Sequence, residues 1–231
     1  MVAQAVVLRH APMTRGVRTL IAATLIGCVG CVLAVIWKVY LSRPKIFTAA
    51  VFIFILAVVW VSIRDKNINN QYMNDTYVRR LATFDGIKYM KNGETRYGAD
   101  MSGIAREALW QAGIIEAIRS VNPSLCGRAF AKFWWHDMDE RDILKGKYDY
   151  TYKVGEALNI GSLDFDTLLP GDMIITEDGT DMKIFMGGDT FLASDGKHIK
   201  SVSLMHMNKN TGHLSDKVAV VRWSGFKDLK K

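Results

Sequence analysis

Two side chains in the second half of the chain have the chemistry of a nucleophile and its base. Cys126 is the only cysteine after residue 31, and His136 follows it between Trp135 and Asp137. A cysteine whose thiol is activated by an imidazole forms covalent intermediates in many hydrolases. A single cysteine in a helical region is also commonly a small, inert core residue. The sequence leaves both interpretations of Cys126 and His136 open.

Three further histidines do not form a metal-binding pattern. His198, His206 and His213 are spread over a segment rich in lysine and asparagine. Zinc sites draw on closely spaced Cys and His ligands, and no such spacing occurs here. We expect a solvated loop, with no metal and no cofactor.

Three blocks of the chain carry a recognisable pattern. They lie at residues 86–106, which include Tyr97-Gly98-Ala99-Asp100-Met101-Ser102-Gly103-Ile104-Ala105-Arg106, at 168–173 with Leu168-Leu169-Pro170-Gly171-Asp172-Met173, and at 181–187 with Asp181-Met182-Lys183-Ile184-Phe185-Met186-Gly187. In order and spacing they resemble the NlpC/P60-type cysteine peptidase family, whose blocks read D-C-S-G-L, L-x-P-G-D-L and H-V-A-I-Y-L-G. The resemblance covers most of residues 80–223, and 114–165 contain no matching motif.

The resemblance implies a fold, an activity and a set of site residues. The fold would be α+β and papain-like, with helices packed on an antiparallel sheet, and the substrates would be peptide bonds of bacterial cell-wall stems. The family's nucleophilic cysteine, its histidine base and the residue that orients the histidine fall at Met101, Asp181 and Ala193. We therefore expect Met101 at the start of a helix, facing strands that carry Asp181 and Ala193.

None of these three residues can perform the family's chemistry. The thioether of Met101 has no proton to lose, so it cannot become a thiolate. Asp181 has no thiol to activate, and Ala193 has no side chain that could orient a base. We predict that the site is catalytically non-functional. The family's cleft residues are retained as Tyr89, Asp100 and Ser102.

The order of the expected elements also favours an α+β domain. Apolar positions spaced as on one face of a helix occur in 101–112 and continue through 114–121. Further helices are expected at about 77–84 and 129–135. Short strands separated by turn residues follow, and we expect them at 173–176, 182–186, 190–194 and 217–223. Helices followed by antiparallel strands are typical of the α+β class.

The first part of the chain has the composition of a membrane anchor. Residues 19–37 and 46–63 are uncharged and mostly aliphatic, and the loop between them holds Lys38, Arg43 and Lys45. Each run is about as long as a helix that crosses a bilayer. We expect a basic tail at 1–18, a transmembrane hairpin at 19–64, a linker at 65–80 and the NlpC/P60-like domain at 81–231.

This anchor predicts a location in the bacterial inner membrane, with the lipid bilayer as a partner. The positive charges on either side of the two runs do not settle which side the domain faces, and the family resemblance favours the periplasm. Residues 1–63 contain six basic residues and no acidic ones, whereas residues 64–231 contain 24 basic and 23 acidic residues. The domain therefore lacks the basic excess of a nucleic-acid-binding protein, and we expect no nucleic-acid partner.

Three functions are compatible with these observations. The first is a pseudo-hydrolase that binds cell-wall peptide or a partner protein through the former catalytic cleft. The second is an active cysteine hydrolase acting on peptidoglycan stem peptides, with Cys126 and His136 as an alternative pair. The third is a structural component of an envelope assembly.

Overall fold

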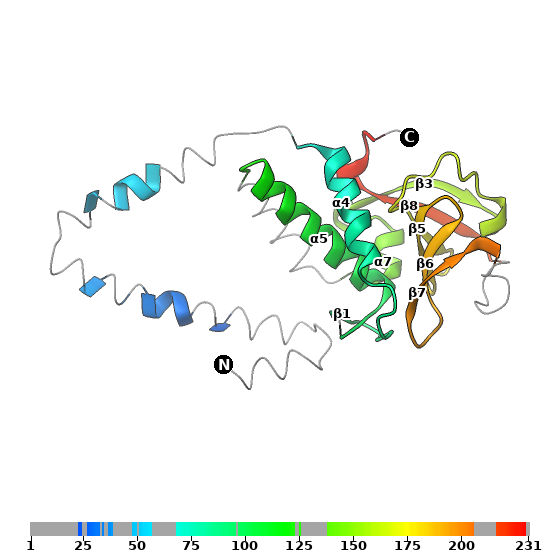
Figure 1. The fold of residues 1–231 in the computed structure, drawn as a ribbon, viewed down its shortest axis with the longest axis horizontal. Coiled ribbons are helices and arrows are strands. Elements are labelled where there is room, and N and C mark those ends of the chain that lie inside the picture. Colours follow the sequence, from blue (N-terminus) through cyan, green and yellow to red (C-terminus); the bar gives the residue numbers. More distant parts are fainter. Residues whose placement is uncertain are drawn as a thin grey trace.

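The described part of the chain forms an α+β domain with an antiparallel sheet, as predicted. The computed structural model describes residues 23–24, 27–32, 34, 37–38, 48–49, 51–56, 68–95, 97–122, 125, 138–205 and 216–229. In Figure 1, the long helices α4 and α5 lie beside one another on one side of the domain, and the strands lie on the other.

The main sheet has six strands in the order β3-β8-β4-β5-β6-β7, and every neighbouring pair is antiparallel. The strands are β3 (Thr151–Ala157), β4 (Met173–Thr176), β5 (Met182–Gly187), β6 (Thr190–Ser194), β7 (Ile199–Ser203) and β8 (Val218–Trp223). A separate small hairpin pairs β1 (Glu94–Thr95) with β2 (Gly98–Ala99). All four expected strands, β4, β5, β6 and β8, are found within one residue of their expected bounds.

The described helices outside the N-terminal segment are α4 (Asn70–Ala82), α5 (Met101–Arg119) and α7 (Glu140–Leu144). Single 3₁₀ turns occur at η2 (Lys147–Asp149), η3 (Ile160–Ser162) and η4 (Ser224–Phe226). The expected helix at 101–121 is confirmed as α5. The expected helix at 129–135 lies outside the described residues.

Helix α4 begins earlier than the sequence indicates. Residues 70–80 are polar and were expected to form most of a linker, yet they belong to a helix that starts at Asn70. The side chain of Asn69 caps it by accepting a hydrogen bond from the Tyr72 N–H at 2.9 Å. Its buried side chains include Met73, Tyr77 and Leu81, at the spacing of one helical face, and these pack into the core. Polar residues on the other face concealed this pattern.

The two faces of the sheet belong to two hydrophobic clusters. Alternation along a strand points successive side chains to opposite faces. On β5, Met182 and Ile184 face the helices and join the larger cluster with α4 and α5, whereas Phe185 joins the smaller cluster. The smaller cluster also contains Phe191 of β6 and Leu168.

Two buried polar contacts connect the helices, the loop before β4 and strand β8. The indole Nε1–H of Trp223 donates to the hydroxyl of Tyr77 at 3.0 Å, which joins β8 to α4. The guanidinium of Arg222 donates to both oxygens of Asp172, at 2.6 and 2.7 Å. The second oxygen of Asp172 also accepts the Leu169 N–H at 2.8 Å. The retained Pro-Gly-Asp block therefore has a structural role, because it fastens the loop before β4 to β8.

Both edge strands of the sheet depart from regular strand pairing. At β7, the segment before β1 runs alongside the strand: the Gly86 N–H donates to the Ile199 carbonyl at 2.8 Å, and the Ile199 N–H donates to the Ile87 carbonyl at 2.8 Å. The Ser201 N–H donates to the Asp85 carboxylate at 3.0 Å. At the opposite edge, the pairing of β3 with β8 shifts register between Lys153 and Gly155.

The predicted membrane hairpin over residues 19–64 requires correction. A bilayer span needs about 20 consecutive apolar residues in one helix. Among the residues that the structure describes, none of the helices combines the length and apolar character that a crossing requires. The two spans, and with them the inner-membrane location, are therefore not supported. Most of residues 19–64 lie outside the described residues.

The Asp172–Arg222 pair yields a prediction about stability. Asp172→Asn should lower the free energy of unfolding by about 3–5 kcal/mol, because it leaves the buried guanidinium of Arg222 without a charge partner. Urea denaturation of the purified protein measures this difference. Asp189→Asn, in an exposed turn, is the matched control and should change stability by less than about 0.5 kcal/mol. Equal losses in the two variants would contradict the role given to the pair.

Candidate functional site

The candidate site lies at the start of α5, where the family resemblance places the nucleophile. Met101 is the first residue of this helix, and Asp100 is its N-cap. The Asp100 Oδ1 accepts the Gly103 N–H at 2.5 Å and the Ser102 hydroxyl at 3.0 Å, and its Oδ2 accepts the Asn92 N–H at 2.6 Å. Aspartate is a preferred residue at this position because it satisfies N–H groups that have no partner within the helix. Asp100 and Ser102, predicted to line the cleft, therefore lie together.

The β1–β2 hairpin packs closely against the first turn of α5. A Cβ atom at Gly103 would lie 2.0 Å from the Gly93 carbonyl oxygen, so only glycine fits there. One turn later, Arg106 forms an ion pair with Glu94 of β1, and both side chains are almost fully buried. These contacts fix the hairpin beside the start of α5.

Met101 is part of the core and does not project into an open cleft. Its side chain is 3% exposed and belongs to the larger hydrophobic cluster. On the strands, the side chains of that cluster include Met182 and Leu192. Packed apolar side chains thus occupy the place where the sequence resemblance would put a nucleophile and its partners.

Asp181 and Ala193 do not face Met101, contrary to the expected site. Asp181 precedes β5, and its carboxylate forms an ion pair with Lys183, two residues further along the same face. Cross-strand pairing sets Lys183 opposite Ile174, which belongs to the smaller cluster on the far face of the sheet. Ala193 lies on the same face as Phe191 of that cluster by alternation.

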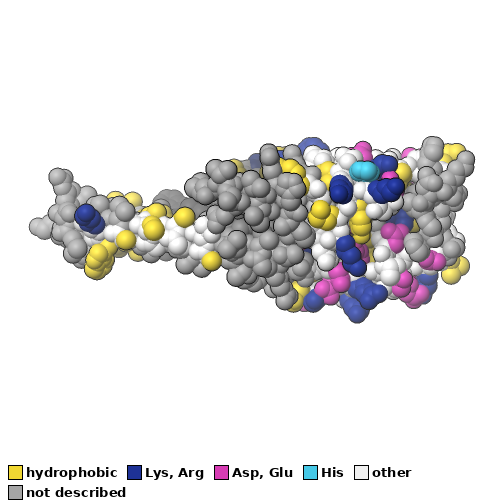
Figure 2. Space-filling model, turned by 90° about the horizontal axis from the view of Figure 1, so that it is seen from below, with side chains coloured by type: hydrophobic (Ala, Val, Ile, Leu, Met, Phe, Trp, Pro, Cys, Tyr) yellow, Lys and Arg dark blue, Asp and Glu magenta, His cyan; other side chains and the backbone are white. Residues whose placement is uncertain are grey.

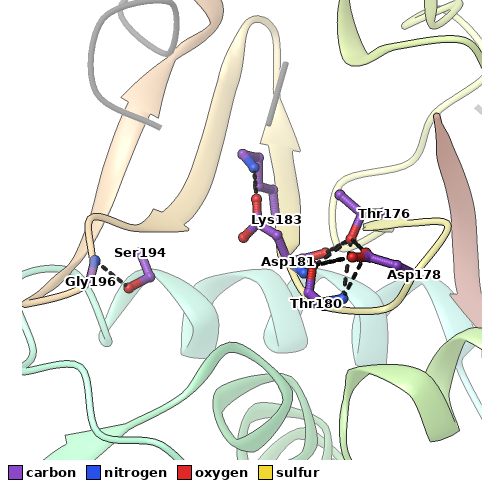
Figure 3. A network of polar contacts seen from close by, with 7 residues as sticks. All are labelled: Thr176, Asp178, Thr180, Asp181, Lys183, Ser194 and Gly196. Atoms are coloured by element: carbon purple, nitrogen blue, oxygen red, sulfur yellow. Dashed lines mark hydrogen bonds and ion pairs between the residues drawn. The ribbon is translucent and has the colours of Figure 1, made fainter. Parts of the chain in front are cut away.

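The turn before β5 holds Asp181 in this orientation. The Thr176 hydroxyl donates to the Asp178 carboxylate at 2.7 Å and accepts the Asp181 N–H at 3.1 Å. Thr180 adds further hydrogen bonds to Asp178. Figure 3 shows this turn, with the side chains of Asp181 and Lys183 directed toward each other. The motif alignment of residues 181–187 is thus off by one residue relative to β5. Met182, and not Asp181, faces the helices.

Tyr89, the third predicted cleft residue, lies close to the start of α5. It forms an isolated bridge with Ala99, next to the N-cap of α5, and its N–H donates to the Lys197 carbonyl at 2.7 Å. Burial raises the pKa of its phenol, and the negative charges of Asp100, Glu140 and Asp181 raise it further. The phenol therefore stays protonated and remains a hydrogen-bond donor at neutral pH.

Glu140 is a component of this site that the sequence motifs did not identify. It is the first residue of α7, a short helix that contacts α5. Burial raises the pKa of Glu140, and the charge of Asp100 adds to this effect. Burial likewise raises the pKa of Asp100, against the effect of its hydrogen bonds. Within 114–165, where no family motif matched, the one local pattern that could have indicated this helix is Asp139, a residue type that commonly caps a helix start.

The other candidate residues are placed only in part. Cys126 and His136 lie outside the described residues, as do His206 and His213. The His198 N–H donates to the Asp195 carboxylate at 2.6 Å, within a turn. Over the described ranges, no three Cys, His, Asp or Glu side chains are grouped in a way that could hold a metal ion. On the coloured surface of Figure 2, basic and acidic side chains are interspersed.

The side-chain orientations at the start of β5 yield a second prediction. In a background where the native cysteines are replaced by serine, Met101→Cys introduces a thiol at the start of α5. Adding Met182→His should lower the pKa of that thiol, because an imidazolium on the facing side stabilises the thiolate. Adding Asp181→His instead should have a smaller effect, since the side chain at position 181 is directed toward Lys183. Ultraviolet absorbance of the thiolate across pH measures both, and a larger shift from Asp181→His would refute the orientation.

Neither the known protein-family models nor the curated proteins include a match to this chain. A function for the site must therefore be argued from its own residues and their geometry.

Proposed function

We propose that this domain is a non-catalytic member of the papain-like, NlpC/P60-type fold. It is a pseudo-hydrolase that binds cell-wall peptide or a partner protein at the start of α5. The observation that carries the proposal is the state of Met101. This residue begins the helix on which the family carries its nucleophile, and its side chain is packed into the core.

The loss of catalysis follows whichever residue is taken as the base. If the catalytic positions are taken from the motif alignment, they are Met101, Asp181 and Ala193, and these three residues include no nucleophile and no orienting group. With the register of the folded strands, Met101 lies in one cluster with Met182 and Leu192, and none of these three can lose or donate a proton. Neither set combines a nucleophile with a general base.

A binding role is supported by what remains around the lost chemistry. Asp100 still caps α5, and Gly93 still packs on Gly103, so the scaffold of the site is intact. Tyr89 is half-buried beside this scaffold and keeps its phenolic proton. A tyrosine with a fixed backbone offers both apolar contact area and a hydrogen-bond donor to a ligand.

The catalytic part of the proposal is tested by hydrolysis of a synthetic cell-wall stem peptide. We expect no turnover by the wild type and none by Met101→Cys, because the added thiol has no imidazole partner to activate it or to protonate the leaving amine. Turnover by the wild type would contradict the proposal. If Cys126→Ala then abolished it, Cys126 would be the nucleophile of an active hydrolase.

The binding part is tested by calorimetric titration of the same peptide into the wild type and two tyrosine variants. Tyr89→Ala should weaken binding by roughly tenfold, as truncation of a central aromatic contact commonly does. Tyr97→Ala is the matched control, because Tyr97 is 56% exposed on the nearby β1–β2 hairpin. Wild-type binding that is unaffected by Tyr89→Ala would place the ligand elsewhere. No binding by a folded wild type would remove cell-wall peptide as the ligand.

A further inference from the structure

Two cysteines lie one helical turn apart in the N-terminal part of the chain. Residues 27–32 form a helix, drawn in blue in Figure 1, and this helix contains Cys28 and Cys31. Both residues are exposed, and both carry a free thiol. The binding function proposed above uses neither of them. The spacing Cys-x-x-Cys is one at which proteins carry reactive thiols that exchange disulfides.

The helical spacing brings the two sulfur atoms within reach of each other. An α-helix has about 3.6 residues per turn and rises by about 1.5 Å per residue, so Cα atoms three residues apart are separated by about 5 Å. A disulfide joins Cα atoms that lie about 4.4–6.8 Å apart, and this condition is met. The Cβ atoms are less well placed, because they lie about 5–6 Å apart on a helix and about 3.5–4.5 Å apart in a disulfide. A bond between Cys28 and Cys31 therefore deforms this turn and is strained.

Two glycines make this turn easy to deform. Gly27 precedes Cys28, and Gly30 precedes Cys31. Glycine is a poor helix former, because it gives up more backbone freedom on folding than any other residue. Over the described residues, no atom lies within 4 Å of the point that a Cβ of either glycine would occupy, apart from the helix itself and the chain neighbours. The turn can therefore adjust without disturbing a packed neighbour.

We propose that Cys28 and Cys31 form a reversible disulfide by exchange with a small-molecule disulfide, which makes this turn a redox-sensitive site. The thiolate of one cysteine attacks a sulfur of the small disulfide, forms a mixed disulfide and releases one small thiol. The thiolate of the second cysteine then attacks the protein sulfur of the mixed disulfide and releases the other small thiol. The protein loses two hydrogen atoms and is oxidised, and the small disulfide is reduced to two thiols.

The bond between Cys28 and Cys31 is one that forms and breaks readily. Strain makes a disulfide easier to reduce, and strained or exposed disulfides are the labile ones in proteins. The exposure of both residues also gives a small disulfide, and later a reductant, access to the sulfur atoms. The site involves none of the residues at the start of α5. It therefore goes beyond the proposed binding function and does not rest on it.

The test is treatment of the purified full chain with oxidised glutathione in a Cys126→Ser background, which leaves only this pair of the three cysteines. The tryptic peptide of residues 19–38, which follows Arg18 and ends at Lys38, contains both cysteines and reports their state by its mass. We expect this peptide to lose the mass of two hydrogen atoms, with no glutathione attached and no free thiol left. Excess dithiothreitol should then restore both thiols.

A matched control moves one thiol by a single residue. In the same background, Gly30→Cys combined with Cys31→Ser puts the two thiols two residues apart, where helical side chains do not face each other. This variant should take up glutathione as mixed disulfides and form no bond within the chain.

Several results would overturn the proposed disulfide. Two free thiols, or stable glutathione adducts, on Cys28 and Cys31 under conditions that modify the control would show that the pair does not close. Disulfide-linked dimers in place of the intrachain bond would have the same meaning. Equal closure in the control would show that the helical turn does not direct the pairing.

Discussion

The carboxylate of Asp100 is the interaction on which the site depends. Its two oxygens join two parts of the chain: the first turn of α5, through the Ser102 hydroxyl and the Gly103 N–H, and the turn that leads into β1, through the Asn92 N–H. Burial makes this charge costly, as the raised pKa of Asp100 indicates, and the converging donors offset that cost. Without this carboxylate the start of α5 and the turn before β1 would lose their common anchor. Asp100 therefore has a structural task that does not depend on any chemistry at the adjoining Met101.

Much of the fold could be predicted from local patterns. The apolar spacing of α5 and the short strands β4, β5 and β6 are visible in the sequence because each element buries one or both faces in a regular period. Helix α4 was only partly found, since its first half is polar and the burial of Met73 and Tyr77 depends on tertiary packing. Strands β3 and β7 were missed. Each lies at an edge of the sheet and carries exposed polar residues, which weaken the alternation.

The site was less predictable than the fold. A motif aligned along the sequence does not reveal which face of a strand a residue occupies, and a displacement of one residue reverses the direction of every side chain. Asp181 lies at the aligned position but its carboxylate pairs with Lys183, whereas Met182 faces the helices. Glu140 could not be found at all, because it lies in a segment without any motif.

The irregular edge strands of the sheet, β7 and β3, limit how a partner could be recognised. Along β7, backbone groups of Ile199 already bond to the segment before β1, and the Ser201 N–H is taken up by Asp85. Along β3, the pairing with β8 shifts register between Lys153 and Gly155, and such an irregularity bends the strand and disfavours the regular pairing of an added one. Within the residues that the structure describes, an extended peptide therefore finds no ready template for β-augmentation. Selectivity for a ligand must come from side chains and loops, which change faster in evolution than a sheet edge does.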